Sequence, residues 1–171
     1  MCIRDRSYTV IADAMKTLFQ LDPQQGLEYT KKLANDDNPT ILVMVGEIYA
    51  QSGDPQYLSF YEKKWNDFDG YDLIPFSDGY WQLVLRADQT TYESSLKKLN
   101  TLANDKKDSN WRRVSATKSL NEIRTVFKEG AADDAVDANT KSILEKRVGD
   151  LTKIIDGIKA QTEDKLSLIH I

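Results

Sequence analysis

The side chains best suited to bind a ligand are Arg112 and Arg113, which directly follow Trp111. A planar guanidinium group donates two parallel hydrogen bonds to one carboxylate, so adjacent arginines suit recognition of an acidic group. Helical periodicity places Trp111 on a buried face and predicts that both arginines point away from it. They then either face a substrate or another domain, or form ion pairs with Asp or Glu of the adjacent helix. The ion pairs are favoured because exposed pairs are frequent.

Two pairs of lysines, Lys31-Lys32 and Lys63-Lys64, are expected in the last turns of helices. Cations there interact favourably with the carbonyl end of the helix dipole, typically by a few tenths to about 1 kcal/mol. This common placement is the favoured interpretation. The functional alternative is a basic ridge that contacts an acidic partner.

Carboxylates gather at Asp36-Asp37 and at Asp67, Asp69 and Asp72. Neither group has the regular ligand spacing and central glycine of an EF-hand loop. Aspartate is common at helix N-termini and in turns, where its side chain accepts hydrogen bonds from backbone amides. These carboxylates are therefore predicted to cap helices and solvate loops.

The ends of the chain have an unusual relation at the level of DNA. Residues 1–6 read MCIRDR and residues 166–171 read LSLIHI. Back-translated with ordinary codons, ATGTGTATAAGAGACAG and CTGTCTCTTATACACAT, they are reverse complements. We therefore expect residues 1–6 and 166–171 to be sequencing-adapter read-through rather than native sequence, and residues 7–165 to be a helical-repeat segment of a longer protein.

The residue types of the expected native segment restrict its chemistry. The only cysteine and histidine, Cys2 and His170, lie in the two ends. Residues 7–165 thus offer no thiolate, no His-ligated metal and no Ser-His-Asp triad, and they contain neither HExxH nor a Gly-rich phosphate loop. A general base at neutral pH would have to be a strongly perturbed carboxylate. We predict no catalytic residue, metal or cofactor in this segment.

Charge and hydropathy restrict the partners. Without Arg4, Asp5 and Arg6 the formal net charge changes from −4 to −5. An acidic segment binds polyanions poorly, so we expect no nucleic acid partner. No apolar run approaches the roughly 20 residues of a membrane-spanning helix, so we expect no membrane span. The absence of cysteine is compatible with either the cytosol or the periplasm.

Apolar residues recur at helical spacing along almost the whole chain, and no stretch alternates as a strand does. Helices are predicted to start at Asp22-Pro23, Asn38-Pro39 and Asp54-Pro55, because Asp or Asn before Pro is a typical N-cap and first helical residue. Gly53 and Gly130 are predicted to end helices. About eight helices joined by short loops result, which predicts an all-α fold.

The sequence also contains an internal repeat. Asp22-Pro23-Gln24 recurs 32 residues later as Asp54-Pro55-Gln56, and Tyr29 and both lysines of the first pair find counterparts in the same register. A third, weaker copy begins at Asp88 and carries Lys97-Lys98. A period near 33 with two helices per repeat is typical of an α-solenoid, here of about four helical hairpins.

Aromatic residues are dense in the middle of the chain. They can line a ligand groove, because aromatic side chains dominate binding anchors, or pack between helical layers. The helical register of Phe76 and Tyr80 favours packing. The members of this set are Trp65, Phe68, Tyr71, Phe76, Tyr80 and Trp81.

Three runs resemble a known family when taken in order and spacing. They are DNPTILVMVGEIYAQSGDPQYLSFYEKKW (37–65), DGYDLIPFSDGYWQLV (69–84) and NWRRVSATKSLNEIR (110–124). Together they resemble the C-terminal HEAT-like helical domain, an ARM-like superhelix, of bacterial zinc aminopeptidases of the aminopeptidase N family, in the variant common among Bacteroidetes. The run DLTKIIDGIKAQTEDK (150–165) resembles the last helix of those enzymes.

The resemblance implies a supporting role. In that family a separate catalytic domain binds zinc through HExxH and a downstream Glu, and none of these residues lies in this segment. The resemblance therefore implies a non-catalytic domain that covers the catalytic domain of the same chain and shapes access of the peptide substrate. If one residue of this segment contacts the substrate or another domain, it is expected to be Arg112 or Arg113.

A second interpretation comes from another class of protein. Gly46, Tyr49, Gly53 and Asp54 lie near the tetratricopeptide pattern, whose period of about 34 fits this repeat. The chain would then be an adaptor that binds a partner peptide in a concave groove. The pattern occurs in one repeat only. HExxH upstream in the reading frame would indicate the peptidase, whereas further 34-residue repeats would indicate the adaptor.

Overall fold

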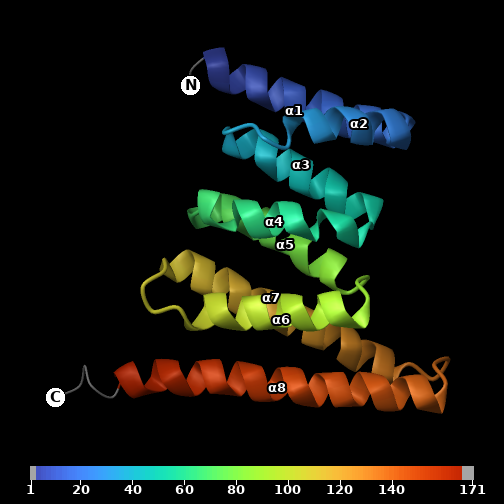
Figure 1. Ribbon diagram of the computed structural model, residues 1–171, viewed down its shortest axis with the longest axis vertical. Helices are drawn as coiled ribbons and strands as arrows, with labels where there is room; N and C mark the ends of the chain where they lie inside the picture. The colour runs from blue at the N-terminus through green and yellow to red at the C-terminus, as the bar shows by residue number, and fades with distance from the viewer. Residues whose placement is uncertain (1–2, 167–171) are drawn as a thin grey trace. The chain divides into compact units, whose positions relative to one another are not determined.

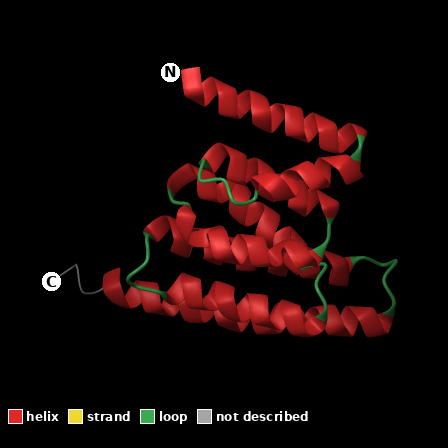
Figure 2. Ribbon diagram, turned by 45° about the horizontal axis from the view of Figure 1, so that its top comes forward, coloured by secondary structure: helices red, strands yellow, loops and turns green. Residues whose placement is uncertain are grey.

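The computed structural model describes the backbone of residues 3–166 and the side chains of residues 7–160, and the chain divides into two compact units, 1–88 and 89–171. The described residues form eight α-helices and three short 3-10 helices, with no strand among them (Figures 1 and 2). The predicted all-α fold is confirmed for this part of the chain. Cys2 and His170 lie outside the described residues.

Each unit consists of consecutive helices. The first contains α1 (Ile3–Leu21), α2 (Pro23–Leu33), α3 (Pro39–Ser52), η1 (Pro55–Tyr57), α4 (Leu58–Lys64), η2 (Trp65–Asp67), η3 (Gly70–Asp72) and α5 (Leu73–Val84). The second contains α6 (Gln89–Asn104), α7 (Asn110–Ala132) and α8 (Ala138–Leu166).

The α-helix starts predicted at Asp22-Pro23 and Asn38-Pro39 are confirmed, whereas Asp54-Pro55 begins the 3-10 helix η1, which leads into α4 at Leu58. Asp22 caps α2 by accepting a hydrogen bond from the Gln25 amide, 3.0 Å away, and Asn38 caps α3 in the same manner. Proline follows each cap at the first helical position, where an amide would have no intrahelical partner. The predicted stop at Gly53 is also confirmed, since its φ of 71° is left-handed.

The predicted stop at Gly130 is wrong. Helix α7 continues to Ala132, and the only described glycines with positive φ are Gly53 and Gly70. A Cβ added at Gly130 would lie 3.2 Å from Leu144 Cδ1. This glycine therefore allows α7 to approach α8 closely rather than ending α7.

The start of α8 depends on Asp137, which the helical pattern did not predict as a cap. Its carboxylate accepts hydrogen bonds from the Asn139 and Thr140 amides, both at 3.0 Å, and from the Thr140 hydroxyl. The Thr140 hydroxyl and amide are the main causes that lower the pKa of this exposed carboxyl group. The ionised form of Asp137 is thus the form that caps the helix.

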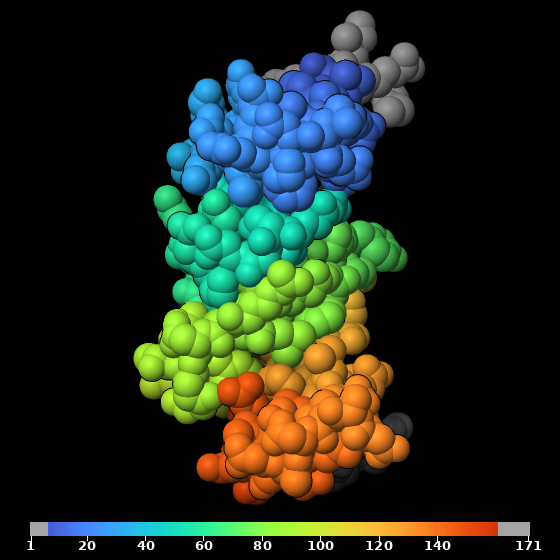
Figure 3. All heavy atoms as spheres, turned by 90° about the vertical axis from the view of Figure 1, so that its right-hand side faces the viewer, coloured from blue at the N-terminus to red at the C-terminus, as the bar shows by residue number. Residues whose placement is uncertain are grey.

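In the first unit, α1 packs on α2 and both contact α3. A Cβ added at Gly26 of α2 would lie 2.5 Å from Phe19 Cα of α1, so a larger residue would push the two backbones apart. The space-filling view shows α1 and α2, in dark and light blue, as a continuous surface (Figure 3).

An aromatic cluster fills the space among α3, α4 and α5. Phe76 stacks on Phe68 with ring centroids 4.2 Å apart, and its ring also meets those of Tyr61 and Trp65. The packing interpretation is confirmed for Trp65, Phe68, Phe76 and Tyr80, which are all buried. It is wrong for Tyr71, which is 78% exposed because it lies in the short η3 turn before α5.

Tyr61 occupies the centre of this cluster. Its buried hydroxyl donates a hydrogen bond to the Gly46 carbonyl of α3. A Cβ added at Gly79 of α5 would overlap Tyr61 Oη and lie 3.0 Å from Cζ. Burial is the main cause that raises the pKa of Tyr61 well above its ordinary value, followed by the charge of Glu47. Two glycines on different helices thus make room for one phenol group.

In the second unit, α7 packs on α6 and on α8 (Figure 1). The predicted burial of Trp111 is wrong, because its side chain is 39% exposed, and Val114, about one turn further along α7, is 63% exposed. The buried residues of α7 lie on the adjacent face of the helix. The first of them are serine and alanine, which a search for large apolar side chains does not detect. These buried residues are Ser115, Ala116, Ser119, Leu120, Ile123 and Phe127.

Candidate functional site

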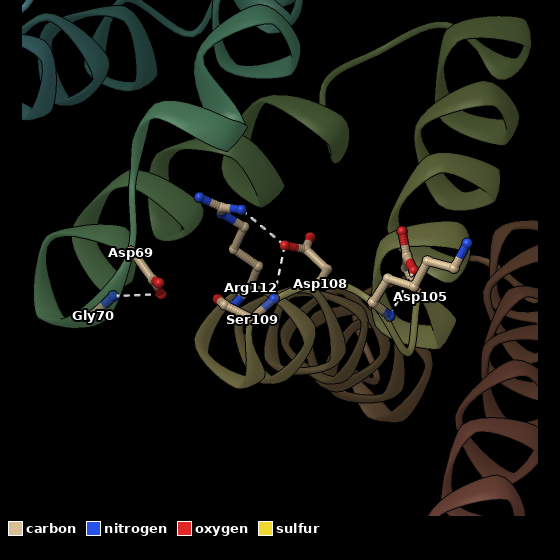
Figure 4. A network of polar contacts seen from close by, with 7 residues as sticks. Asp69, Gly70, Asp105, Asp108, Ser109 and Arg112 are labelled. Carbon is tan, nitrogen blue, oxygen red and sulfur yellow. Dashed lines mark hydrogen bonds and ion pairs between the residues drawn. The ribbon is translucent and has the colours of Figure 1, made fainter.

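Arg112 braces the start of α7. Its Nη1 lies 2.8 Å from Asp108 Oδ1, an oxygen that also accepts a hydrogen bond from the Ser109 amide (Figure 4). Ser109 caps the helix, since its hydroxyl accepts from the Arg112 amide at 3.2 Å. The Arg112 and Asp108 side chains are 22% and 12% exposed. Arg112 therefore has a carboxylate partner in the loop that leads into its own helix.

Arg113 lies differently although it is the next residue. Its Nε donates a long hydrogen bond of 3.4 Å to the Ala103 carbonyl, near the end of α6. Its half-buried side chain lines a hollow of about 610 Å³ formed by α6, α7 and α8. The structure thus separates the two arginines, since only Arg113 of the pair lines this hollow.

We name this hollow the α7–α8 hollow. Volumes of a few hundred to about 1,000 Å³ are typical of sites that bind small ligands or short chain segments. Its described lining residues are Ala103, Asn110, Arg113, Val114, Thr117, Lys118, Asn121, Ile158 and Lys159.

Sequence reasoning singled out Arg113 but missed its neighbours. Arg113, Val114, Thr117, Lys118 and Asn121 recur at spacings of three and four along α7, so they share one helical face. That spacing was available in the sequence. The contribution of α8, some 40 positions further along the chain, was not, because it depends on how the helices pack.

The lysine pairs lie largely where they were predicted. Lys31-Lys32 occupy the last turn of α2, and Lys63-Lys64 occupy the last turn of α4. Lys64 Nζ lies 3.1 Å from Asp67 Oδ2 and donates at 3.4 Å to the Asp36 carbonyl. Lys97-Lys98 differ, because α6 continues beyond them to Asn104. Lys64 thus connects the end of α4 to Asp67 and to the loop before α3.

The carboxylate groups behave as turn and cap residues. Asp36 Oδ1 accepts from the Asn38 amide at 2.7 Å, and Asp69 Oδ1 accepts from the Gly70 amide at 2.9 Å (Figure 4). Among residues 7–160, whose side chains the structure describes, no group of three or more His, Cys, Asp or Glu residues is placed to hold a metal ion.

A second hollow in the same unit, of about 520 Å³, is lined by residues of α6 and α8. The guanidinium of Arg147 lies over the Tyr92 ring at 4.6 Å and over the Phe127 ring at 5.2 Å, and Nη2 donates to Gln89. Burial raises the pKa of Tyr92 to about 12, although the nearby Arg147 charge lowers it. The Arg147 cation of α8 thus contacts one aromatic ring of α6 and one of α7.

No helix of the described residues has the length and apolar character needed to cross a membrane. Comparison with known proteins yields no relative. No protein-family model matches this chain, and neither a curated protein nor a solved structure matches it.

Proposed function

We propose that this chain is a non-catalytic helical-repeat domain of a zinc metallo-aminopeptidase. The observation that best supports a non-catalytic role is the way its charged side chains are used. Arg112 pairs with Asp108, Lys64 pairs with Asp67, and Asp22 and Asp137 cap helices. Groups with these partners stabilise helix ends and loops rather than transferring protons.

The assignment to an aminopeptidase rests on the three resembling runs and the final helical run. In such a parent, this domain would cover the catalytic domain of the same chain and limit access of peptide substrates. Zinc would be held by the catalytic domain, and this segment would need no cofactor. The α-solenoid arrangement of hairpins belongs to the same proposal, as does a bacterial origin.

Arg113 is the stronger candidate for contact with substrate or with the catalytic domain, because it lines the α7–α8 hollow while Arg112 is paired with Asp108. Recovery of the upstream reading frame tests the parent directly, and HExxH several hundred residues before this segment is the expected result. In that parent, Arg113→Ala is expected to raise KM for peptides. Unchanged kcat and KM would reject the contact role.

The tetratricopeptide-like adaptor stays the second candidate, and one local observation favours it. Helix α3 places Gly46 against the Tyr61 and Phe76 rings, as a small residue at a helix–helix contact, and ends at left-handed Gly53. The first repeat packs differently, since Tyr29 is 46% exposed whereas its counterpart Tyr61 is fully buried. Further repeats of 34 residues upstream, without HExxH, would replace the peptidase with this adaptor.

A further inference from the structure

We propose that the bond between Asp69 and Gly70 is a site of spontaneous covalent modification, where the chain rearranges through a succinimide ring into an isoaspartyl linkage. The inference goes beyond the proposed function, because it concerns one peptide bond of this chain whichever parent protein carries it.

Aspartate directly before glycine is the dipeptide that undergoes this rearrangement most readily. Glycine has no side chain, so the carboxyl group of the preceding aspartate can approach the glycine amide nitrogen closely. The three bonds of this type have the same residue types on both sides, so we attribute differences among them to the fold. They are Asp69-Gly70, Asp78-Gly79 and Asp156-Gly157.

The Asp69-Gly70 pair lies at the start of η3. Asp69 is exposed and extended, with a φ of −150° and a ψ of 161°, and it caps η3. Its Oδ1 accepts a hydrogen bond from the Gly70 amide at 2.9 Å (Figure 4). The Gly70 amide has no intrahelical acceptor, because it belongs to the first residue of the helix. The carboxyl group and the nitrogen that attacks it are therefore in contact, whatever other group the carboxylate also contacts.

Gly70 also gives the backbone room to close the ring. Ring closure needs a rotation about the bond between Cα and the carbonyl carbon of Asp69, and the next residue must absorb this rotation. Gly70 has a φ of 69°, and an added Cβ would meet no atom within 4 Å. A glycine in open space adopts many backbone conformations, so the rotation requires little rearrangement of its surroundings.

The other two Asp-Gly pairs lie inside helices. Gly157 is an exposed residue in the interior of α8, where its amide is part of the helical hydrogen-bond ladder. Gly79 lies inside α5 and is buried against Tyr61. The Asp78 carboxylate also accepts a hydrogen bond from Trp81 Nε1 at 3.3 Å. Rotation at either aspartate breaks helical hydrogen bonds, and loss of two such bonds slows ring closure by roughly tenfold or more.

The reaction conserves atoms and needs no oxidant. The Gly70 amide nitrogen gives up its proton to solvent and bonds to Cγ of the protonated Asp69 carboxyl group, whose hydroxyl group takes up a proton and leaves as water. Water then opens the ring at one of its two carbonyl carbons. Cleavage of the new bond from nitrogen to Cγ restores aspartate. Cleavage of the original bond from nitrogen to the main-chain carbonyl carbon leaves the chain running through the side chain, which is isoaspartate.

Isoaspartate at this position would change how the chain enters α5. It lengthens the main chain by one carbon atom between Phe68 and Leu73, which are both buried. It also moves the carboxylate that caps η3. The modified chain would therefore have to fit a longer connection between two fixed side chains.

The test follows isoaspartate in the whole folded chain during long incubation in mildly acidic buffer near physiological temperature. Trypsin releases Asp69 and Asp78 in peptide 65–86 and Asp156 in peptide 154–159. Electron-transfer fragmentation assigns isoaspartate to each position, and methyl transfer from S-adenosylmethionine by an L-isoaspartyl methyltransferase measures the total. We expect roughly tenfold or more isoaspartate at position 69 than at either other position. Equal yields at the three positions, or none at position 69, would overturn the proposal.

Unfolding provides a comparison within the same chain. In concentrated urea all three Asp-Gly pairs lose their helical or turn surroundings, so their isoaspartate yields should become similar. A preference for position 69 that stays as strong in urea would also overturn the proposal, because the fold would then not select the bond.

Variants provide the matched control. Asp69→Glu is expected to remove most of the total isoaspartate, because a six-membered ring closes far more slowly than a five-membered one. Asp156→Glu makes the same change at another exposed aspartate and is expected to leave the total unchanged. Asp69→Asn keeps an oxygen that can cap η3 and is expected to raise the yield, because an amide loses ammonia more readily than a carboxylate loses its oxygen. Circular dichroism checks that the variants stay folded, and an unchanged total in folded Asp69→Glu would refute the inference.

Discussion

Two buried tyrosine hydroxyls of this chain have opposite surroundings. The Tyr61 hydroxyl donates to the Gly46 carbonyl. The Tyr92 hydroxyl is buried and has no hydrogen-bond partner among the side chains and backbone groups that the structure describes. A buried hydrogen bond stabilises a protein by about 1 kcal/mol, whereas a buried polar group left without a partner costs about 1–3 kcal/mol.

Removal of each hydroxyl should therefore change stability in opposite directions. Tyr61→Phe is expected to lower the free energy of unfolding by about 1 kcal/mol, and Tyr92→Phe to raise it or leave it unchanged. The aromatic ring at position 92 keeps its contact with Arg147 in both variants. Urea unfolding of the two variants and of the unsubstituted chain measures these changes in the free energy of unfolding. A loss at Tyr92 as large as that at Tyr61 would contradict this account.

The same buried phenols predict a dependence on alkaline pH. Burial raises the pKa of Tyr49 and of Tyr92 from 10.0 to about 12. The folded state then holds protons that the unfolded state releases, so the stability contributed by the neutral phenols is complete below pH 10. It is lost as the pH rises from 10 through 12.

The measurement is the urea midpoint at pH values between 9 and about 12, with tyrosinate absorbance as a second signal. The midpoint should fall across this window, and the fall should be smaller in a Tyr49→Phe, Tyr92→Phe double variant. If the urea midpoint depends on pH in the same way in the double variant and in the unsubstituted chain, groups other than Tyr49 and Tyr92 cause the effect.

At the level of single residues, sequence reasoning succeeded where the interaction is local. Asp22, Asn38 and Gly53 were predicted correctly, because a cap contacts amides only two or three residues away. It failed for Trp111, because the burial of a side chain depends on distant helices. It identified Arg113 but not Lys159, because a hollow between helices is a product of tertiary packing.

At the level of helices, small residues set how closely neighbours approach. Gly26 lies against the α1 backbone, Gly79 against Tyr61, and Gly130 near Leu144 of α8. From the sequence, Gly130 was predicted only to end a helix. Glycine both ends helices and allows two helices to approach closely, and its position in the sequence does not distinguish these two roles. Gly149, by contrast, is an exposed helical residue with nothing within 4 Å of an added Cβ.

A pair of glycine variants tests this distinction. Gly79→Ala is expected to destabilise the chain by about 1–3 kcal/mol, because the new methyl group overlaps a buried phenol that has no room to move. Gly149→Ala is expected to stabilise it by up to about 1 kcal/mol through higher helix propensity. Thermal unfolding followed by circular dichroism compares them. Destabilisation by both variants would show that glycine is needed for helix geometry and not for space.

At the level of the whole molecule, the all-helical class followed from apolar periodicity, because helices are encoded by nearby residues. The internal repeat was a weaker guide. Its two copies share caps and lysine pairs but differ in packing, as Tyr29 and Tyr61 show. Surface caps recur because they satisfy the same local need, while the buried positions must fit different neighbours.

The proposed function, in which a separate domain carries the catalytic zinc, makes a prediction for residues 7–165. Purified residues 7–165 are expected to bind no stoichiometric zinc and to hydrolyse no aminoacyl or peptide substrate, because cysteine and histidine are confined to positions 2 and 170. Metal analysis after dialysis against zinc, together with a chromogenic aminopeptidase assay, checks both. One equivalent of retained zinc, or activity abolished by a chelator, would contradict the proposed role.

The contact of Tyr61 with Gly46 and Gly79 also has an evolutionary consequence. The three positions should vary together, because a Cβ at position 79 would overlap the phenol oxygen of Tyr61 and a Cβ at position 46 would lie 3.3 Å from the same ring. Ancestral lines would then exchange tyrosine for phenylalanine before glycine for alanine, and rarely in the reverse order. In distant homologues, this linked triplet should persist after the exposed lysines and aspartates have diverged.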